Sequence, residues 1–180
     1  KGEDDHHHAR FICSQTIVMS LEGIPAFYIH AMLATPNDHA QVEHRGMSRA
    51  INRHRWDYPS LRDRLADASS AQARVLGDLS ARLKVRQKQK AFHPNATQFT
   101  VNLQDDRVFG VWRQSLDRKQ SIFALHNVSD EVVNVVASSL NMIEDEDWVD
   151  LLSGERIEST GEDIVLQPYQ CRWITNRVPR

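Results

Sequence analysis

The stretch Gly23-Ile-Pro-Ala-Phe-Tyr-Ile-His-Ala-Met-Leu33 decides how this chain is built. Apolar residues recur at helical spacing across the preceding residues 7–21, which predicts a helix there. Gly23 then stands where a helix commonly ends, and Pro25 bars the helix from continuing. The short apolar run 26–29 is typical of a buried parallel strand. The opening is therefore predicted to be a helix followed by a parallel strand, as in half of a βα repeat.

A long segment without apolar periodicity follows, across residues 34–58, and it contains Ser48-Arg-Ala-Ile-Asn-Arg-His54. Loops of this length are uncommon unless they are functional. Beyond it, Ser60-Leu-Arg-Asp63 resembles a helix-capping box and predicts a short helix. The pair Ser69-Ser70 predicts the start of a second helix that reaches about residue 90.

The pattern changes near Phe92, where short alternating segments separated by turn residues begin. Such segments predict a small antiparallel β-sandwich. The predicted strands cover residues 99–103, 108–112, 121–126, 131–135, 148–152, 164–166 and 169–174. The charge balance shifts at the same place: residues 1–92 carry 14 Lys and Arg against 10 Asp and Glu, whereas residues 93–180 carry 8 against 14. We therefore expect two domains, 1–92 and 93–180.

Composition narrows the class of protein. Of the 180 residues, 41% are hydrophobic and 26% are charged, which suits a packed core rather than disorder. The formal net charge of −2 gives no general reason to expect nucleic acid. The basic run Lys84-Val-Arg-Gln-Lys-Gln-Lys90 lacks interleaved aromatic residues, so a solvated helix face is favoured over a nucleic-acid interface. No apolar run is typical of a membrane span or a signal peptide, and two distant cysteines, Cys13 and Cys171, predict reduced thiols in a cytoplasmic protein.

In their order along the chain, these features resemble the end of a sucrose-phosphorylase-type barrel of glycoside hydrolase family 13, in the α-amylase superfamily. The Gly-Ile-Pro segment is shared widely in that superfamily, and the segment Ser48 to His54 narrows the resemblance to the phosphorylase branch. His126-Asn-Val128 and Leu151-Leu-Ser-Gly154 resemble structural segments of the family's C-terminal domain. The implied fold class is α/β plus all-β: the last helix, strand and loop helices of a (β/α)8 barrel, followed by a small antiparallel β-sandwich.

The resemblance implies retaining glucosyl transfer from sucrose or a related α-glucoside to phosphate, which yields glucose 1-phosphate. The family's nucleophile and acid lie at barrel strands four and five, and a stabilising aspartate follows strand seven. All three precede the part that this chain resembles, so we expect no catalytic residue here, and Asp4, Asp5 and Asp38 inherit no such role. The implied partners are sugar, phosphate and a missing N-terminal barrel portion, without a metal, cofactor, nucleic acid or membrane. Sucrose, sucrose 6-phosphate and glucosylglycerate all stay open as substrates.

The resemblance assigns one substrate-binding residue, Arg49, to the donor subsite on the loop after the last barrel strand. A guanidinium offers fixed planar donors to sugar hydroxyls or to a phosphate oxygen. His30 and Asn52 are secondary candidates, the alternatives being a packed histidine and an asparagine that holds the loop in shape. The alternative for the loop's arginines in general is a solvated surface with ion pairs to Glu43 and Asp57. A metal site at His6-His7-His8 is disfavoured because three adjacent histidines on a helix cannot all point one way.

A second class of function stays open: a non-catalytic carbohydrate-binding or interaction module. Trp112, Trp148 and Trp173 could then form a stacking platform for sugars. Tryptophans in strands more often belong to a core. Exposed rings would support the binding module, and buried rings would count against it.

Overall fold

The computed structural model describes residues 4–140, 142, 147–157 and 163–177. The chain forms two compact units: one comprises Lys1–Pro25 with Arg82–Arg180, and the other comprises Ala26–Ala81. The chain passes between them after Pro25 and again within one long helix. The domain boundary inferred near Phe92 comes from sequence pattern and charge, and it stays a prediction.

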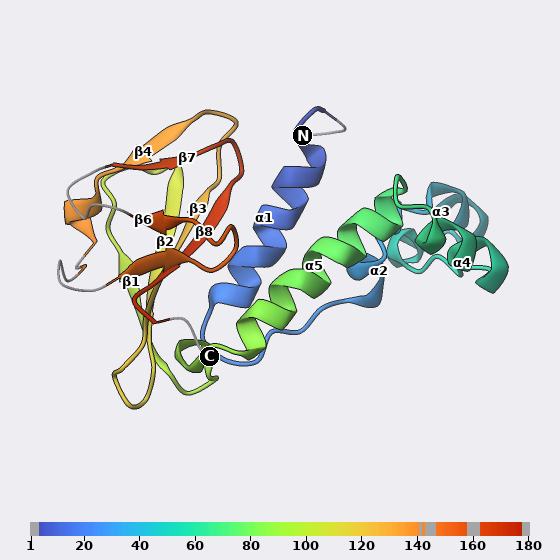
Figure 1. Ribbon diagram of the computed structural model, residues 1–180. Coiled ribbons are helices and arrows are strands. Elements are labelled where there is room, and N and C mark those ends of the chain that lie inside the picture. The colour runs from blue at the N-terminus through green and yellow to red at the C-terminus, as the bar shows by residue number, and fades with distance from the viewer. Residues whose placement is uncertain (1–3, 141, 143–146, 158–162, 178–180) are drawn as a thin grey trace. The chain divides into compact units, whose positions relative to one another are not determined.

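The larger unit is built on antiparallel sheets, as predicted (Figure 1). One sheet has the order β1-β2-β3-β8-β5-β6, and a second pairs β4 with β7. The strands are β1 (Thr97–Val101), β2 (Val108–Gln114), β3 (Ser121–Asn127), β4 (Val133–Val135), β5 (Trp148–Asp150), β6 (Arg156–Ile157), β7 (Ile164–Leu166) and β8 (Cys171–Thr175). A 3₁₀ turn, η2 (Lys90–Phe92), precedes β1, and a second, η3 (Ala137–Ser139), lies between β4 and β5. The predicted strands are confirmed to within a few residues, and among the strands of the described residues β6 is the one that the pattern missed.

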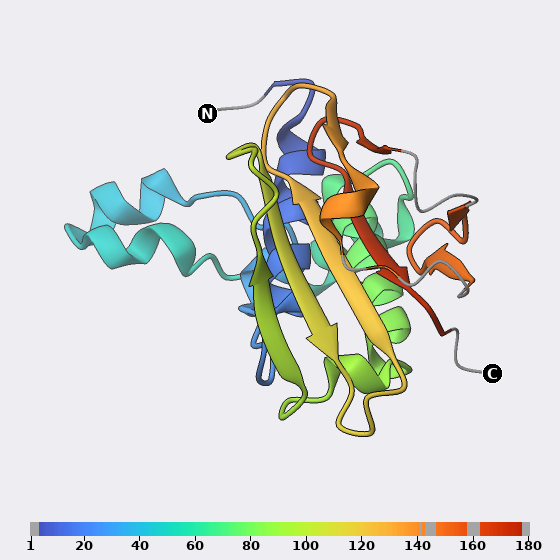
Figure 2. The same ribbon diagram turned by 90° about the vertical axis from the view of Figure 1, so that its left-hand side faces the viewer.

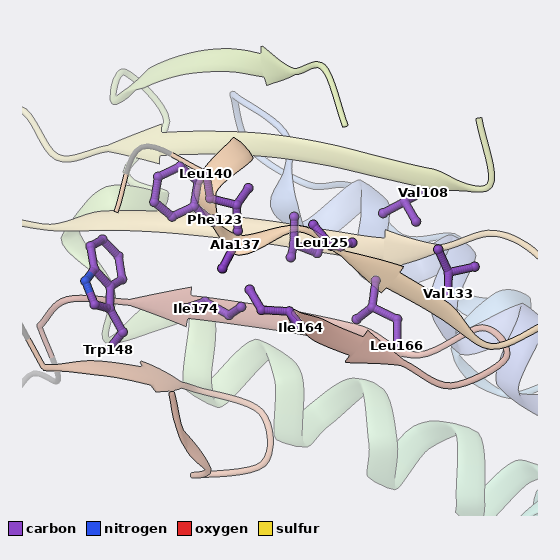
Figure 3. Packing of buried hydrophobic residues seen from close by; sticks show 11 residues of the cluster. Val108, Phe123, Leu125, Val133, Ala137, Leu140, Trp148, Ile164, Leu166 and Ile174 are labelled. Atoms are coloured by element: carbon purple, nitrogen blue, oxygen red, sulfur yellow. The ribbon is translucent and has the colours of Figure 1, made fainter. Parts of the chain in front are cut away.

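The core of this unit lies between the two sheets (Figure 3). Strand β4 buries its two end valines and exposes Asn134, and its partner β7 buries Ile164 and Leu166. These side chains meet Phe123 and Leu125 of the large sheet. Period-two alternation thus places the apolar face of the small sheet on the large one.

Helix α1 (His7–Ser20) is the predicted first helix, and it contacts strand β3. Figure 2 shows β1, β2 and β3 side by side, with α1 behind them. Because α1 lies on one side of β3 and the small sheet on the other, residues 122–127 are buried throughout. Cys13 of α1 and Cys171 of β8 are free thiols in one buried cluster with Tyr169.

The carbonyl end of α1 is held by two arginines from other elements. Arg86 donates from Nε to the Met19 carbonyl at 2.7 Å, and Arg113 donates to the Ser20 carbonyl at 3.1 Å. The last turn of α1 has no basic residue of its own. Cations near a helix C-terminus pair with the unsatisfied carbonyls and with the helix dipole, so these arginines fix where α1 ends.

The smaller unit is helical among its described residues. Its elements are α2 (Ile29–Met32), α3 (His39–Arg45), η1 (Ser48–Asn52), α4 (Tyr58–Ala66) and the first part of α5 (Ala71–Gln87). The parallel strand predicted for residues 26–29 is wrong: residues 24–28 have no regular structure, and α2 begins at Ile29. A parallel strand needs a neighbour to pair its backbone groups, and no described segment offers one.

Two further corrections concern helix caps. Residues 34–58 are not all loop, because Asp38 caps α3 and Gly46 ends it in the left-handed conformation, with φ of 61°. The capping box predicted at Ser60 is also wrong: Asp57 caps α4 and accepts from the Ser60 amide at 3.1 Å. Ser70, by contrast, caps α5 as predicted, since its hydroxyl accepts from the Ala73 amide at 3.0 Å.

Candidate functional site

The predicted substrate-binding arginine lies on a turn that presents it to solvent. Arg49 is exposed within η1, and only its neighbour Ala50 is buried there. No ion pair among the described residues involves Arg49, and Asp57 caps a helix instead of neutralising the arginines. The guanidinium is therefore available to an anionic or hydroxyl-rich ligand.

Asp38 ties the segment that carries Arg49 to itself. Its carboxylate accepts from the Gln41 amide at 3.0 Å and lies 3.0 Å from Nδ1 of His54. Its own amide donates to the Ile51 carbonyl at 2.7 Å. Hydrogen bonding to His54 and to the Gln41 amide lowers the pKa of Asp38, so the carboxylate stays ionised. One residue thus joins the start of the segment to its end.

Thr35 and Tyr28 make two more links. Thr35 Oγ1 accepts from Nε1 of Trp56 at 2.9 Å and lies 3.0 Å from Nδ1 of His30. The Tyr28 hydroxyl donates to the Asn52 carbonyl at 2.8 Å. Each link joins the α2 region to the end of the segment, so the loop is cross-linked at both ends.

The two secondary candidates, His30 and Asn52, both make hydrogen bonds within the loop, whereas among the described residues the Arg49 side chain makes none. His30 is partly buried, lies against the Tyr28 ring with centroids 5.1 Å apart, and uses Nδ1 toward Thr35. Asn52 has an exposed side chain, and its backbone carbonyl is what holds Tyr28. These contacts fit loop-holding roles, and neither residue's substrate contact is tested by them.

Sequence reasoning missed the residues that organise this loop. The sequence excludes Asp38 as a catalytic carboxylate and gives it no other predicted role. Its position directly before α3 is a common helix-start signal and could have identified it. The partners of Thr35 are local in space but depend on the folded loop, so no spacing rule reveals them.

Tryptophans of the β unit give no sugar platform. Trp148 and Trp173 are buried, and Trp112 is partly buried and packs on Phe123. This burial counts against the carbohydrate-binding module. Within the described ranges no group of three or more histidine, cysteine or acidic side chains could hold a metal ion. None of the described helices is long and apolar enough to cross a membrane.

No family model matches the chain, but it is similar in sequence to curated proteins that share the name glucosylglycerate phosphorylase. It is 37% identical over 171 residues to the glucosylglycerate phosphorylase of Allomeiothermus silvanus and 31% identical over 174 residues to that of Escherichia coli. These alignments cover 95% and 97% of this chain but 28% and 29% of the relatives. The chain thus spans less than a third of the length of the relatives it matches.

Solved structures agree in fold. The structure of AmyP in complex with maltose superimposes with a TM-score of 0.72 over 99% of this chain, at 14% identity. The α-amylase of Geobacillus thermoleovorans complexed with acarbose gives 0.67 over 93%, at 16% identity. The matched regions cover 36% of the AmyP chain and 33% of the α-amylase chain. Such low identities show the fold alone.

The resemblance inferred from residues 23–33 and 48–54 is thus confirmed by sequence relatives and by fold. Along nearly its whole length the chain is thus similar to a portion of curated glucosylglycerate phosphorylases, and it shares its fold with a portion of solved α-amylase structures.

Proposed function

We propose that this chain is the C-terminal portion of a retaining glycoside phosphorylase that transfers glucose from glucosylglycerate to phosphate. The observation that carries the proposal is 37% identity, over 95% of the chain, to a glucosylglycerate phosphorylase. Of the three substrates left open by the sequence, glucosylglycerate is the one that the printed names of these relatives favour.

The role proposed for this portion is donor binding rather than bond cleavage. Retaining transfer needs a nucleophile and an acid on opposite sides of the scissile bond, and no residue of the chain matches either motif. Arg49 supplies planar N–H donors that suit a glucosyl hydroxyl or a phosphate oxygen. Its exposure and its cross-linked loop support this assignment.

A chimaera tests the proposal. The C-terminal portion of the A. silvanus enzyme is replaced by this chain, and release of glucose 1-phosphate is measured with phosphate and each of the three α-glucosides. We expect turnover of glucosylglycerate, with sucrose and sucrose 6-phosphate far behind. A chimaera that prefers sucrose would contradict the substrate, and a folded chimaera inactive on all three would contradict the function.

A further inference from the structure

We propose that Asp38 is a positioning residue for Arg49: it fixes the 38–54 segment so that the guanidinium is held ready for the glucosyl donor. The proposal rests on the proposed function of Arg49 and adds to it the residue that orders the loop. Asp38 has no substrate-contacting role in it.

Three hydrogen-bonded links converge on Asp38. Through its side chain Asp38 reaches Gln41 and His54, and through its amide it reaches Ile51. Ile51 and His54 follow Arg49 in the sequence, and Gln41 precedes it. Removing the side chain therefore breaks one link on each side of Arg49, to Gln41 and to His54, and leaves the backbone link to Ile51 in place.

Besides the Asp38 links, the turn around Arg49 is held by the Tyr28 hydroxyl bonded to the Asn52 carbonyl and by little buried apolar surface. Residues 43–49 are exposed, and Gly46 interrupts them with a positive φ. Ala50 is the only buried residue of η1. A turn with one small buried side chain depends mainly on its hydrogen bonds for order.

The negative charge of the Asp38 carboxylate strengthens its hydrogen bonds. The Asp38 side chain has 16% of its surface exposed, and the His54 side chain has 34%. A carboxylate in a partly buried site makes shorter, stronger hydrogen bonds than a neutral amide does. Substitution by asparagine keeps the shape and the helix cap but loses that charge, so it should loosen the loop partly.

Asp57 is a matched control within the same unit. It is also an N-cap aspartate, and it accepts from the amide and hydroxyl of Ser60 at 3.1 and 2.8 Å. It makes no link to the 38–54 segment among the described contacts. Asp57→Ala therefore loses a cap of the same kind without freeing the turn.

Hydrogen exchange on the full chain is the first measurement. Asp38→Ala should raise exchange at least about tenfold across residues 41–54, and Asp57→Ala should leave that segment unchanged. Unchanged exchange in Asp38→Ala would overturn the ordering role, whatever the activity of any enzyme that contains the chain.

Kinetics of the chimaera are the second measurement. Asp38→Ala should lower kcat/KM for glucosylglycerate about ten- to a hundredfold, mainly through KM, and Asp38→Asn should lower it less. In the double variant with Arg49→Ala, the loss should equal that of Arg49→Ala alone, because Asp38 acts through Arg49. If the double variant instead lost kcat/KM by the product of the two single losses, Asp38 would not act through Arg49, and the proposed function would stand. No loss in Arg49→Ala would overturn the donor-site role, and with it this one.

Discussion

At the scale of single residues, two charged or titratable side chains carry separate claims. Arg49 is exposed on a turn and acts, by our proposal, on a ligand. His126 is fully buried in the β unit and acts on stability. The role of Arg49 is predicted from its sequence motif and stays a prediction, whereas the burial of His126 follows from elements that pack on both sides of β3.

In the chimaera, Arg49→Ala should lower kcat/KM about ten- to a hundredfold, because a charged hydrogen bond to the donor is lost. Arg45→Ala, on the same segment, should change it by less than about fivefold, as expected for an exposed surface charge. Arg49→Lys should recover only part of the loss, since one ammonium cannot reproduce the planar fork. Equal kcat/KM values for the two alanine variants would show that Arg49 does not touch the substrate.

His126 should make the stability of the chain depend on pH. Its Nδ1 lies 3.0 Å from the Phe109 carbonyl and its Nε2 lies 3.0 Å from the Ser20 hydroxyl, so the neutral ring donates to the carbonyl. Burial lowers the pKa of His126 to about 4. Between the ordinary value near 6.5 and about 4, the unfolded chain binds the proton and the folded chain does not.

The contribution of His126 to the free energy of unfolding should therefore be constant above about pH 6.5. It should fall as the pH drops toward 4, by about 3 kcal/mol in total. Urea unfolding at stepped pH measures this, with His126→Gln as the comparison. The variant should be less stable at pH 7 but lose less stability on acidification. Parallel pH curves for the two proteins would contradict the assignment.

At the scale of elements, local signals predicted most of the β unit, and long-range requirements explain the errors. Strands such as β2 and β3 alternate and end at turn residues, so their pattern is local. The two-residue strand β6 is too short to leave a pattern. Residues 26–29 have the composition of a strand but lack a partner among the described residues. Cross-links such as that of Asp38 to His54 depend on the folded chain and cannot be read from spacing.

The position of helix α1 should depend on Arg113. This buried guanidinium donates to the carbonyls of Ser20, His93 and Ala96 at 2.9–3.3 Å. Arg113→Met would leave these acceptors unpaired, at a cost of about 2–3 kcal/mol. Urea unfolding of the chain measures it, and Arg62→Met, at an arginine exposed on α4, is the control and should change little. Equal stability of both variants would contradict the role of Arg113 as a helix cap.

At the scale of the whole molecule, the two compact units should differ in stability. The unit at 26–81 buries few side chains, whereas strands β2, β3 and β8 are buried along most of their length. Residues 39–66 should therefore exchange amide hydrogens at least about a hundredfold faster than residues 108–127. Residues 7–20 should be protected with the sheet, because α1 contacts β3. Equal protection of both units would count against this division.

The central claim is that this chain completes a glycoside phosphorylase without carrying its catalytic carboxylates. The most direct measurement compares glucose 1-phosphate release from glucosylglycerate and phosphate by three proteins: the isolated chain, the A. silvanus enzyme lacking its C-terminal portion, and that truncated enzyme fused to this chain. The account predicts product from the fusion alone. Turnover by the purified isolated chain, or no gain from the fusion over the truncated enzyme, would contradict it.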